Sequence, residues 1–243
     1  MFLDFDGTLS RLVADPDRAR LLPGLKNILK KLARHPHIRI MIISGRSLAD
    51  VRKRFGINNL IYAGNHGFEI YFKKRYLLRK GKKYRAIVSR ASSLLKKQLR
   101  DIPGVIVEPK GLSVAVHFRN TPYSYLAVIK KTVEVISKST GIKNKLALTT
   151  GKKIFELRPH KNWNKGFAVR WVWQKMAPKA CPIFIGDDVT DEDAFEALKK
   201  DGMTIRVGKK QKSAALYYIK QTEDVVKTLS QIAQLFFNQI SKN

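Results

Sequence analysis

The sequence predicts an α/β fold: a Rossmann-like core built on a parallel sheet, with a smaller α+β unit inserted into it. Near both ends of the chain short apolar runs alternate with amphipathic helices, which is typical of a parallel sheet with helices on both faces. In the middle of the chain helices and strand-like runs follow one another without this alternation. We therefore expect the core to comprise residues 1–81 and 152–243, and the insert to comprise residues 82–151.

The first stretch of the core carries short apolar runs that end in polar residues. Continuous apolar runs of this length indicate strands buried on both faces of a sheet. Apolar residues spaced three and four apart predict the helices between them. The expected elements are strands over Met1–Phe5, Ile38–Ile43 and Leu60–Ala63, helices after Pro23 and over Leu48–Phe55, and a hairpin over Phe68–Leu78.

The insert and the second stretch of the core complete the expected fold. In the insert we expect a helix over Ile87–Leu95, strands over Val105–Glu108 and Leu112–Arg119, and a helix over Tyr123–Ser139. The core then resumes with a strand over Ile154–Arg158, a helix from Asn164, strands over Pro182–Ile185 and Met203–Val207, and a last helix over Val225–Phe236. A capping box at Thr190–Asp193 predicts one more helix between the last two strands.

The composition is that of a folded protein of a reducing compartment. Hydrophobic residues make up 44 % of the chain, and Cys181 is its one cysteine, so no disulfide framework is expected. The opening residues MFLDFDGTL lack the basic start and apolar stretch of a signal peptide. No apolar run reaches membrane-spanning length. We therefore expect a soluble cytoplasmic protein with no membrane partner.

The net charge of +29 is unusual and is densest over Lys73–Arg85. A charge of this size attracts polyanions, so one interpretation is a nucleic-acid-binding protein. The other is a solvated basic surface that also draws in an anionic substrate. The second is favoured, because no stacking motif or recognised binding module accompanies the charge.

Polar clusters follow three of the predicted strands: DFDGT, SGR and GDD. Ligands of open parallel sheets bind beyond the carboxyl ends of the strands, so these clusters should meet in one crevice. Carboxylates that lie close together repel one another unless a cation neutralises them, and a hard divalent ion with oxygen ligands suits that purpose. We therefore predict a Mg²⁺ site among five acidic residues, Asp4, Asp6, Asp187, Asp188 and Asp191.

The same crevice offers groups that can bind a phosphoryl group. Gly7 permits a tight turn that brings backbone N–H groups to an anion. Thr8 and Ser44 supply hydroxyl donors, and Lys165, at the start of a predicted helix, supplies a positive charge. Together with the predicted metal, these groups indicate phosphate-ester chemistry.

The DFDGTL, SGR, NKG and GDDVTDEDAF blocks, in this order, resemble the four motifs of the haloacid-dehalogenase (HAD) superfamily of phosphotransferases. The resemblance implies that Asp4 is the nucleophile and becomes an aspartyl phosphate, and that Asp6 is the general acid and base. It further implies that Mg²⁺ is held by Asp4, the Asp6 carbonyl and Asp187. The implied phosphate-binding residues are Thr8, Ser44, Gly45 and Lys165, with Asp188 and Asp191 in supporting positions.

Further blocks resemble the trehalose-6-phosphate phosphatases within that superfamily. GDDVTDEDAF resembles their fourth motif, whereas relatives that act on sucrose phosphate or mannosyl phosphoglycerate usually read GDSGND-like there. VEPKGLSVAVHFR resembles their cap signature, and AGNHGFE and GKKIFELRP fit the same family. The resemblance implies a cap of the C2B type, hydrolysis of trehalose 6-phosphate in trehalose biosynthesis, and a possible trehalose-6-phosphate synthase partner.

The strand Leu112–Arg119 alternates apolar and polar residues, so its apolar face should pack on helices of the insert and its polar face should stay available. The resemblance implies that Glu108 and Lys110 contact the sugar. His66, His117 and Arg119 are further candidates for substrate binding. His66 has an equally simple interpretation as a loop cap, and His117 as a structural residue of the insert.

Two alternative functions stay open on the sequence alone. A HAD phosphatase acting on another disaccharide phosphate or a glycosyl-glycerate phosphate would keep the same chemistry. A basic nucleic-acid-binding protein on a phosphatase-like scaffold is disfavoured, because every predicted catalytic position carries a competent residue.

Overall fold

The computed structural model describes residues 1–151, 153–159, 163–209 and 212–240. The chain divides into two compact units, Met1–Leu78 with Trp163–Asn243, and Arg79–Asn162. We call them the core unit and the inserted unit. Within the described ranges, no helix is both long and apolar enough to cross a membrane.

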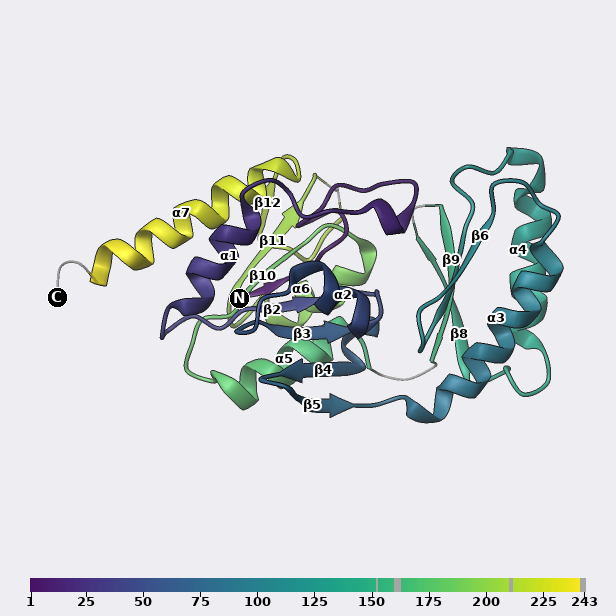
Figure 1. Cartoon of the computed structure of the whole chain (residues 1–243), viewed down its shortest axis with the longest axis horizontal. Helices are drawn as coiled ribbons and strands as arrows, with labels where there is room; N and C mark the ends of the chain where they lie inside the picture. Colours follow the sequence, from purple (N-terminus) through teal and green to yellow (C-terminus); the bar gives the residue numbers. More distant parts are fainter. Residues whose placement is uncertain (152, 160–162, 210–211, 241–243) are drawn as a thin grey trace. The chain divides into compact units, whose positions relative to one another are not determined.

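The core unit is built on an eight-stranded sheet of order β12-β11-β10-β1-β2-β3-β4-β5 (Figure 1). The strands from β12 to β3 are parallel, and β4 runs antiparallel to β3. The strands are β1 (Phe2–Leu3), β2 (Met41–Ile43), β3 (Ile61–Gly64), β4 (Glu69–Phe72), β5 (Arg75–Arg79), β10 (Ile183–Gly186), β11 (Met203–Val207) and β12 (Tyr217–Ile219). The expected parallel sheet and the hairpin of β4 and β5 are therefore confirmed.

Helices cover both faces of this sheet, because neighbouring residues of the buried strands point to opposite faces. Leu3 packs in one apolar cluster with residues of α1, α2 and α7, whereas Phe2 packs in another with residues of α5 and α6. α1 and α7 lie side by side in Figure 1. The helices are α1 (Leu25–Arg34), α2 (Leu48–Phe55), α5 (Lys165–Met176), α6 (Glu192–Leu198) and α7 (Glu223–Ile240).

The inserted unit is a four-stranded antiparallel sheet of order β6-β7-β9-β8 with two helices. Val114 and Val116 of β7 pack with residues of the helices in one apolar cluster, which confirms the expected apolar face of this strand. The elements are α3 (Arg85–Leu99), β6 (Ile106–Pro109), β7 (Val114–His117), α4 (Leu126–Lys138), β8 (Leu146–Gly151) and β9 (Ile154–Pro159).

Two sequence-based expectations are wrong, one about the inserted unit and one about the core unit. The strand at Ile154–Arg158 does not return to the core sheet, because β9 pairs with β7 and β8 of the inserted unit. The capping box does not start at Thr190, because the reciprocal bonds join Asp188 and Asp191 around a short 3-10 turn, Val189–Asp191, and α6 follows. In this capping box the carboxylate of Asp188 accepts the backbone N–H of Asp191, the third residue of the turn. The hydroxyl of Thr190 does not have this role.

Gly166 lets α5 approach α6 closely at the end of the helix that carries Lys165. A Cβ atom at this position would lie 2.2 Å from the carbonyl oxygen of Asp193 and 3.2 Å from the Cβ of Ala197. A Cβ atom cannot lie as close as 2.2 Å to a carbonyl oxygen, so any residue larger than glycine must push the two helices apart.

Gly166→Ala is therefore expected to lower the free energy of unfolding by about 1–3 kcal/mol through overpacking. Denaturant unfolding of the purified variant measures this. Gln174→Ala, at an exposed position of the same helix, is the control and should change the free energy by less than about 0.5 kcal/mol. Equal stabilities of the two variants would show that the helix contact tolerates a methyl group.

Candidate active site

Four predicted residues meet at the carboxyl edge of the core sheet. Asp4 follows β1, Asp187 follows β10, and Asp191 ends the short turn after that strand. The carboxylate oxygens of these three residues lie within 4.8 Å of one another. Lys165, the first residue of α5, donates from Nζ to Asp4 Oδ1 at 2.6 Å and to Asp191 Oδ1 at 2.7 Å.

Regular local structure holds each of these groups. The amide of Asp4 donates to the carbonyl of Ile185, which ties the first residue after β1 to the neighbouring strand. The other oxygen of Asp191, Oδ2, accepts the backbone N–H groups of Asp187 and Asp188, each at 3.0 Å. The side chain of Asn164 caps the first turn of α5 and so fixes where Lys165 begins.

The cluster is almost fully buried, and its carboxylates outnumber its ammonium group. Asp4, Asp187, Asp191 and Lys165 are all at most 4 % exposed. Burial raises the pKa of Asp4 well above its ordinary value, and the charges of Asp191 and Asp187 raise it further, although Lys165 opposes them. Burial alone would lower the pKa of Lys165, but the charges of Asp191 and Asp4 raise it above its ordinary value.

This donor set fits a hard divalent cation. Three carboxylates face one ammonium group in a buried space, and their oxygens are close enough to share one ion. Magnesium and calcium prefer such oxygen ligands. Neutralisation by a cation would also remove the repulsion that raises the pKa of Asp4. Of the predicted metal ligands, Asp4 and Asp187 lie in this cluster. Asp191, predicted as a supporting residue, lies there too.

Asp6 does not place its side chain in the carboxylate cluster. Its two oxygens accept from Arg46 at 2.6 and 2.7 Å, and Arg46 is 6 % exposed. Arg46 also donates to Asp50 at 3.0 Å, and Asp50 in turn accepts from Arg54. This arrangement is compatible with the predicted metal contact of Asp6, since that contact uses the backbone carbonyl and not the side chain.

The predicted phosphate-binding residues lie beside the cluster on the same edge of the sheet. Thr8 is fully buried, and its hydroxyl lies 3.4 Å from Asp187 Oδ1. Ser44 follows β2, the neighbour of β1, and its oxygen accepts the backbone N–H of Arg46 at 3.1 Å. Gly45 has a steric reason to be glycine, because a Cβ there would lie 2.7 Å from the ring of His66.

His66 packs against this loop in an uncommon backbone conformation. Asn65 and His66 have φ angles of 51° and 55°, in the left-handed region that favours glycine. His66 is 7 % exposed, and its backbone N–H donates to the carbonyl of Ser44 at 2.9 Å. Non-glycine residues in this region are often found at functional sites, so the strain is consistent with a role for His66 beside Ser44 and Gly45.

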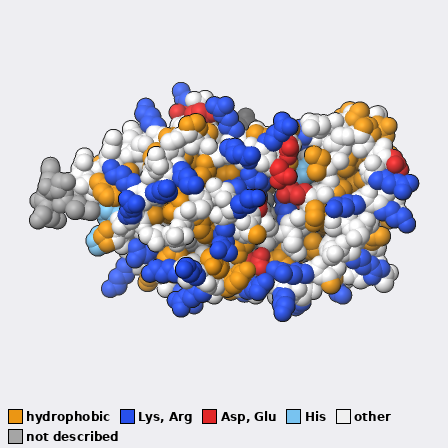
Figure 2. Space-filling view, in the orientation of Figure 1, with side chains coloured by type: hydrophobic (Ala, Val, Ile, Leu, Met, Phe, Trp, Pro, Cys, Tyr) orange, Lys and Arg blue, Asp and Glu red, His pale blue; other side chains and the backbone are white. Residues whose placement is uncertain are grey.

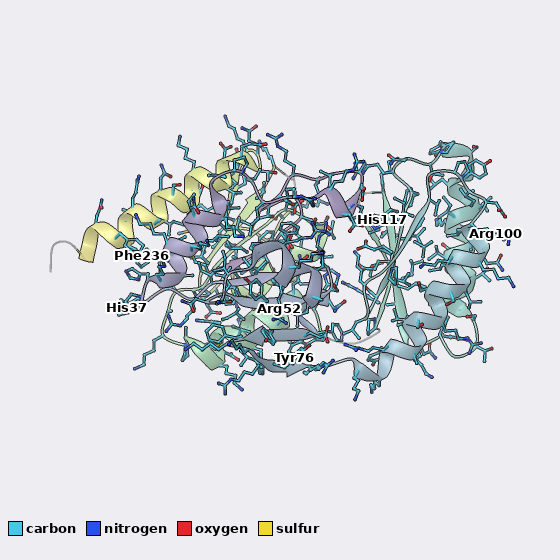
Figure 3. The ribbon with its side chains drawn as sticks, viewed as in Figure 1. His37, Arg52, Tyr76, Arg100, His117 and Phe236 are labelled. Carbon is cyan, nitrogen blue, oxygen red and sulfur yellow. The ribbon has the colours of Figure 1, made fainter. Side chains whose placement is uncertain are left out.

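A second polar cluster lies in the inserted unit. Glu108 of β6 and Glu156 of β9 flank Ala115 of β7 in the sheet register. His117 Nε2 lies 2.8 Å from Glu108 Oε2, and Lys110 Nζ lies 3.8 Å from a carboxylate oxygen of each glutamate. Figure 3 labels His117 on this sheet. The structure thus brings together three predicted substrate-binding residues, whereas Arg119, two positions beyond His117, is exposed.

Sequence reasoning assigned no role at the site to Ser113, Glu156, Arg206 or Arg46. Ser113 donates to Glu156 at 2.6 Å, so Glu156 is part of the polar cluster in the inserted unit. Arg206 of β11 is 6 % exposed, donates to the carbonyls of Asp187 and Asp188, and pairs with Glu192 at 2.7 Å. An arginine inside a short, mostly apolar strand was the signal, since buried arginines are nearly always paired. For Arg46, the signal was its position just before the predicted helix that carries Asp50 and Arg54, which are spaced four residues apart.

The chain is similar to known proteins of one family. A model of the family described as trehalose-phosphatase matches residues 2–223. The chain is 41 % identical over 209 residues to the trehalose-phosphate phosphatase of Mycobacterium leprae and 40 % identical over 214 residues to that of Mycobacterium marinum. These matches cover 82 % and 85 % of the chain but 47 % and 53 % of the relatives, so the chain spans about half their length.

Solved structures agree with the family model. A crystal structure described as a trehalose-6-phosphate phosphatase related protein aligns with a TM-score of 0.86 at 26 % sequence identity. The alignment covers 98 % of each chain, so both units of the fold have counterparts in that structure.

Lys165→Met removes the one ammonium group between Asp4 and Asp191 and leaves two buried carboxylates without their cation. We expect the free energy of unfolding to fall by about 3–5 kcal/mol, measured by denaturant titration at neutral pH in excess chelator. Lys199→Met removes an exposed lysine that pairs with Glu196, and should cost less than about 1 kcal/mol. If the two variants lost equal stability, the buried ion pairs would not be important to the fold.

Proposed function

The chain belongs to the trehalose-phosphatase family, and on this basis we propose that it is a Mg²⁺-dependent phosphatase of the HAD superfamily. Its substrate is trehalose 6-phosphate, which it hydrolyses to trehalose and phosphate as a step of trehalose biosynthesis. The observation that carries the proposal is the buried cluster of Asp4, Asp187, Asp191 and Lys165 at the carboxyl edge of the sheet.

Asp4 is the nucleophile. Lys165 holds one of its oxygens at 2.6 Å and so fixes the orientation of the carboxylate. Attack on phosphorus forms a bond between phosphorus and Asp4 and breaks the bond from phosphorus to the sugar oxygen, which leaves an aspartyl phosphate. Lys165, Ser44, Thr8 and the backbone of Gly45 stabilise the negative charge on the phosphoryl oxygens.

Asp6 is the general acid and base. It donates a proton to the departing sugar oxygen, and then takes a proton from the water that hydrolyses the aspartyl phosphate. Both oxygens of Asp6 accept from Arg46, so Asp6 must give up at least one of these bonds before it can donate. Arg46 is thus a positioning residue that holds Asp6 between turnovers.

Asp4, Asp187 and the carbonyl of Asp6 would hold the Mg²⁺ ion. When bound, it supplies positive charge that offsets the carboxylates and polarises a phosphoryl oxygen. Asp191 holds Lys165 and the backbone of Asp187 in place, and the side chain of Asp188 caps the turn that carries Asp191.

The inserted unit is a cap of the C2B type that supplies the selectivity for the sugar. Glu108, Lys110 and His117 form a connected set of donors and acceptors, which suits the hydroxyl groups of a disaccharide. His66 and Arg119 are further substrate-binding residues in this proposal. A trehalose-6-phosphate synthase is a proposed partner, and a cytoplasmic location is proposed with it.

Asp4→Asn should abolish the release of phosphate from trehalose 6-phosphate, because an amide is a poor nucleophile and a weaker metal ligand. Turnover is measured as phosphate release in the presence of Mg²⁺, with circular dichroism as a check of folding. Asp15→Asn, which changes the half-buried cap of a 3-10 turn, is the control and should retain activity. Hydrolysis by Asp4→Asn at the wild-type rate would rule out the covalent mechanism.

Glu108→Ala and Lys110→Ala should each lower kcat/KM for trehalose 6-phosphate by about tenfold to a hundredfold, because each removes a charged hydrogen-bonding group. Hydrolysis of a small chromogenic phosphate ester should stay the same, because this substrate has no sugar hydroxyls. Glu134→Ala, in the exposed face of α4, is the matched control.

Equal losses on both substrates would mean that the cap substitutions disturb the chemistry in general. Loss on neither substrate would place sugar recognition elsewhere. A sugar-phosphate panel that prefers another disaccharide phosphate or a glycosyl-glycerate phosphate would overturn the choice of trehalose.

A further inference from the structure

The core unit has a pocket at the edge of the sheet opposite to the candidate active site. Its walls include Ile38 and Arg39, just before β2, the turn between β4 and β5, and the last turns of α1 and α5. Ile38 and Arg39 lie at the amino end of β2, and the last turns of α1 and α5 are the carboxyl ends of these helices (Figure 1). The cavity volume is about 550 Å³. We call it the amino-edge pocket.

Five cationic side chains line the amino-edge pocket, and among the described residues that line it none is acidic. The cations are Arg34, Arg39, Lys73, Arg75 and Lys175. In the part of the chain that the structure describes, no ion pair joins any of them to a carboxylate. Five like charges around one cavity repel one another, so their proximity favours an anion between them.

Neutral groups hold three of these cations in place. Arg39 donates from Nη1 to the carbonyls of Pro36 and Ile38 at 2.8 and 3.1 Å. Lys175 lies 4.9 Å from the ring centre of Trp171, and Lys73 lies 5.6 Å from that of Phe72. Carbonyls and aromatic rings position a cation without cancelling its charge, so these three cations are positioned and the pocket stays positive.

The turn that brings Lys73 into the wall is itself unusual. Lys73 and Lys74 have φ angles of 46° and 62°, so both central residues of the hairpin turn are left-handed. Asn-Gly is typical of such turns, because lysine pays a steric penalty there. The chain keeps two lysines in spite of this strain, which is consistent with a need for positive charge at this place.

The size and walls of the pocket favour a small ligand with an apolar part. A volume of this order suits a single small molecule, whereas a nucleic-acid duplex needs a long open surface. Ile38, Phe72, Leu77 and Met176 supply apolar wall next to the cations. Blue side chains are spread over the visible face in Figure 2, but the amino-edge pocket is where five of them share one cavity.

We propose that the amino-edge pocket binds a small organic polyanion of the nucleoside triphosphate type, with the phosphates on the five cations and the base against the apolar wall. The site lies apart from the carboxylate cluster and does not depend on the proposed phosphatase activity.

The test is calorimetric titration of the purified chain with a non-hydrolysable ATP analogue in 150 mM salt and excess chelator, a salt level at which exposed charges are screened over about 8 Å. The chelator leaves the carboxylate cluster anionic, so that cluster should repel the nucleotide. We expect one site per chain. Arg34→Ala with Arg75→Ala should weaken binding by about tenfold or more, because two charge-assisted contacts are lost.

Lys26→Ala with Lys30→Ala removes the same charge from exposed positions of α1 outside the pocket, and should change the affinity by less than about twofold. Equal weakening by the two double variants, or no saturable binding, would overturn the proposal. So would tighter binding of a single-stranded oligonucleotide that both double variants weaken, which would indicate a diffuse polyanion surface. Inorganic tripolyphosphate that bound as tightly as the analogue would overturn the assignment of a nucleotide.

Discussion

Three carboxylates and one ammonium group share the buried carboxyl edge of the core sheet, and this unequal charge is the constraint on which the site depends. Lys165 bridges the buried Asp4 and Asp191, and the next residue, Gly166, lies where α5 packs closely on α6. The single positive charge of Lys165 does not balance the three carboxylates, and a divalent cation can neutralise the remaining negative charge. Packing of two helices is thus a condition for the chemistry that we propose.

The two units divide the proposed work according to their architecture. The core unit gathers acids at the ends of parallel strands, a placement that suits phosphoryl chemistry whatever alcohol is attached. The inserted unit groups Glu108, Lys110 and His117 in one polar cluster, and the apolar residues of β7 pack with its helices. Substitutions at Glu108, Lys110 and His117 can therefore change which sugar is bound without changing the reaction.

The sequence predicted most of the core because its central strands, β1, β2 and β10, are apolar and are followed by polar residues, as at Asp4 and Asp187. It misplaced β9, since a short strand does not reveal its partners. The alternation of apolar and polar residues at Phe155, Glu156 and Leu157 was a usable signal, because such a sequence pattern is typical of an antiparallel sheet. The side-chain contact between Asp6 and Arg46 could not be predicted, because it depends on a rotamer choice.

The central claim is that the carboxylate cluster binds one divalent cation. Calorimetric titration of the chain with Mg²⁺ tests it most directly, with Asp187→Asn as the variant that removes a proposed ligand. The account predicts one Mg²⁺ site per chain, a rise in the unfolding midpoint on binding, and a marked loss of both in the variant. If the wild-type chain bound no Mg²⁺, or if Asp187→Asn bound it equally well, the account would be contradicted.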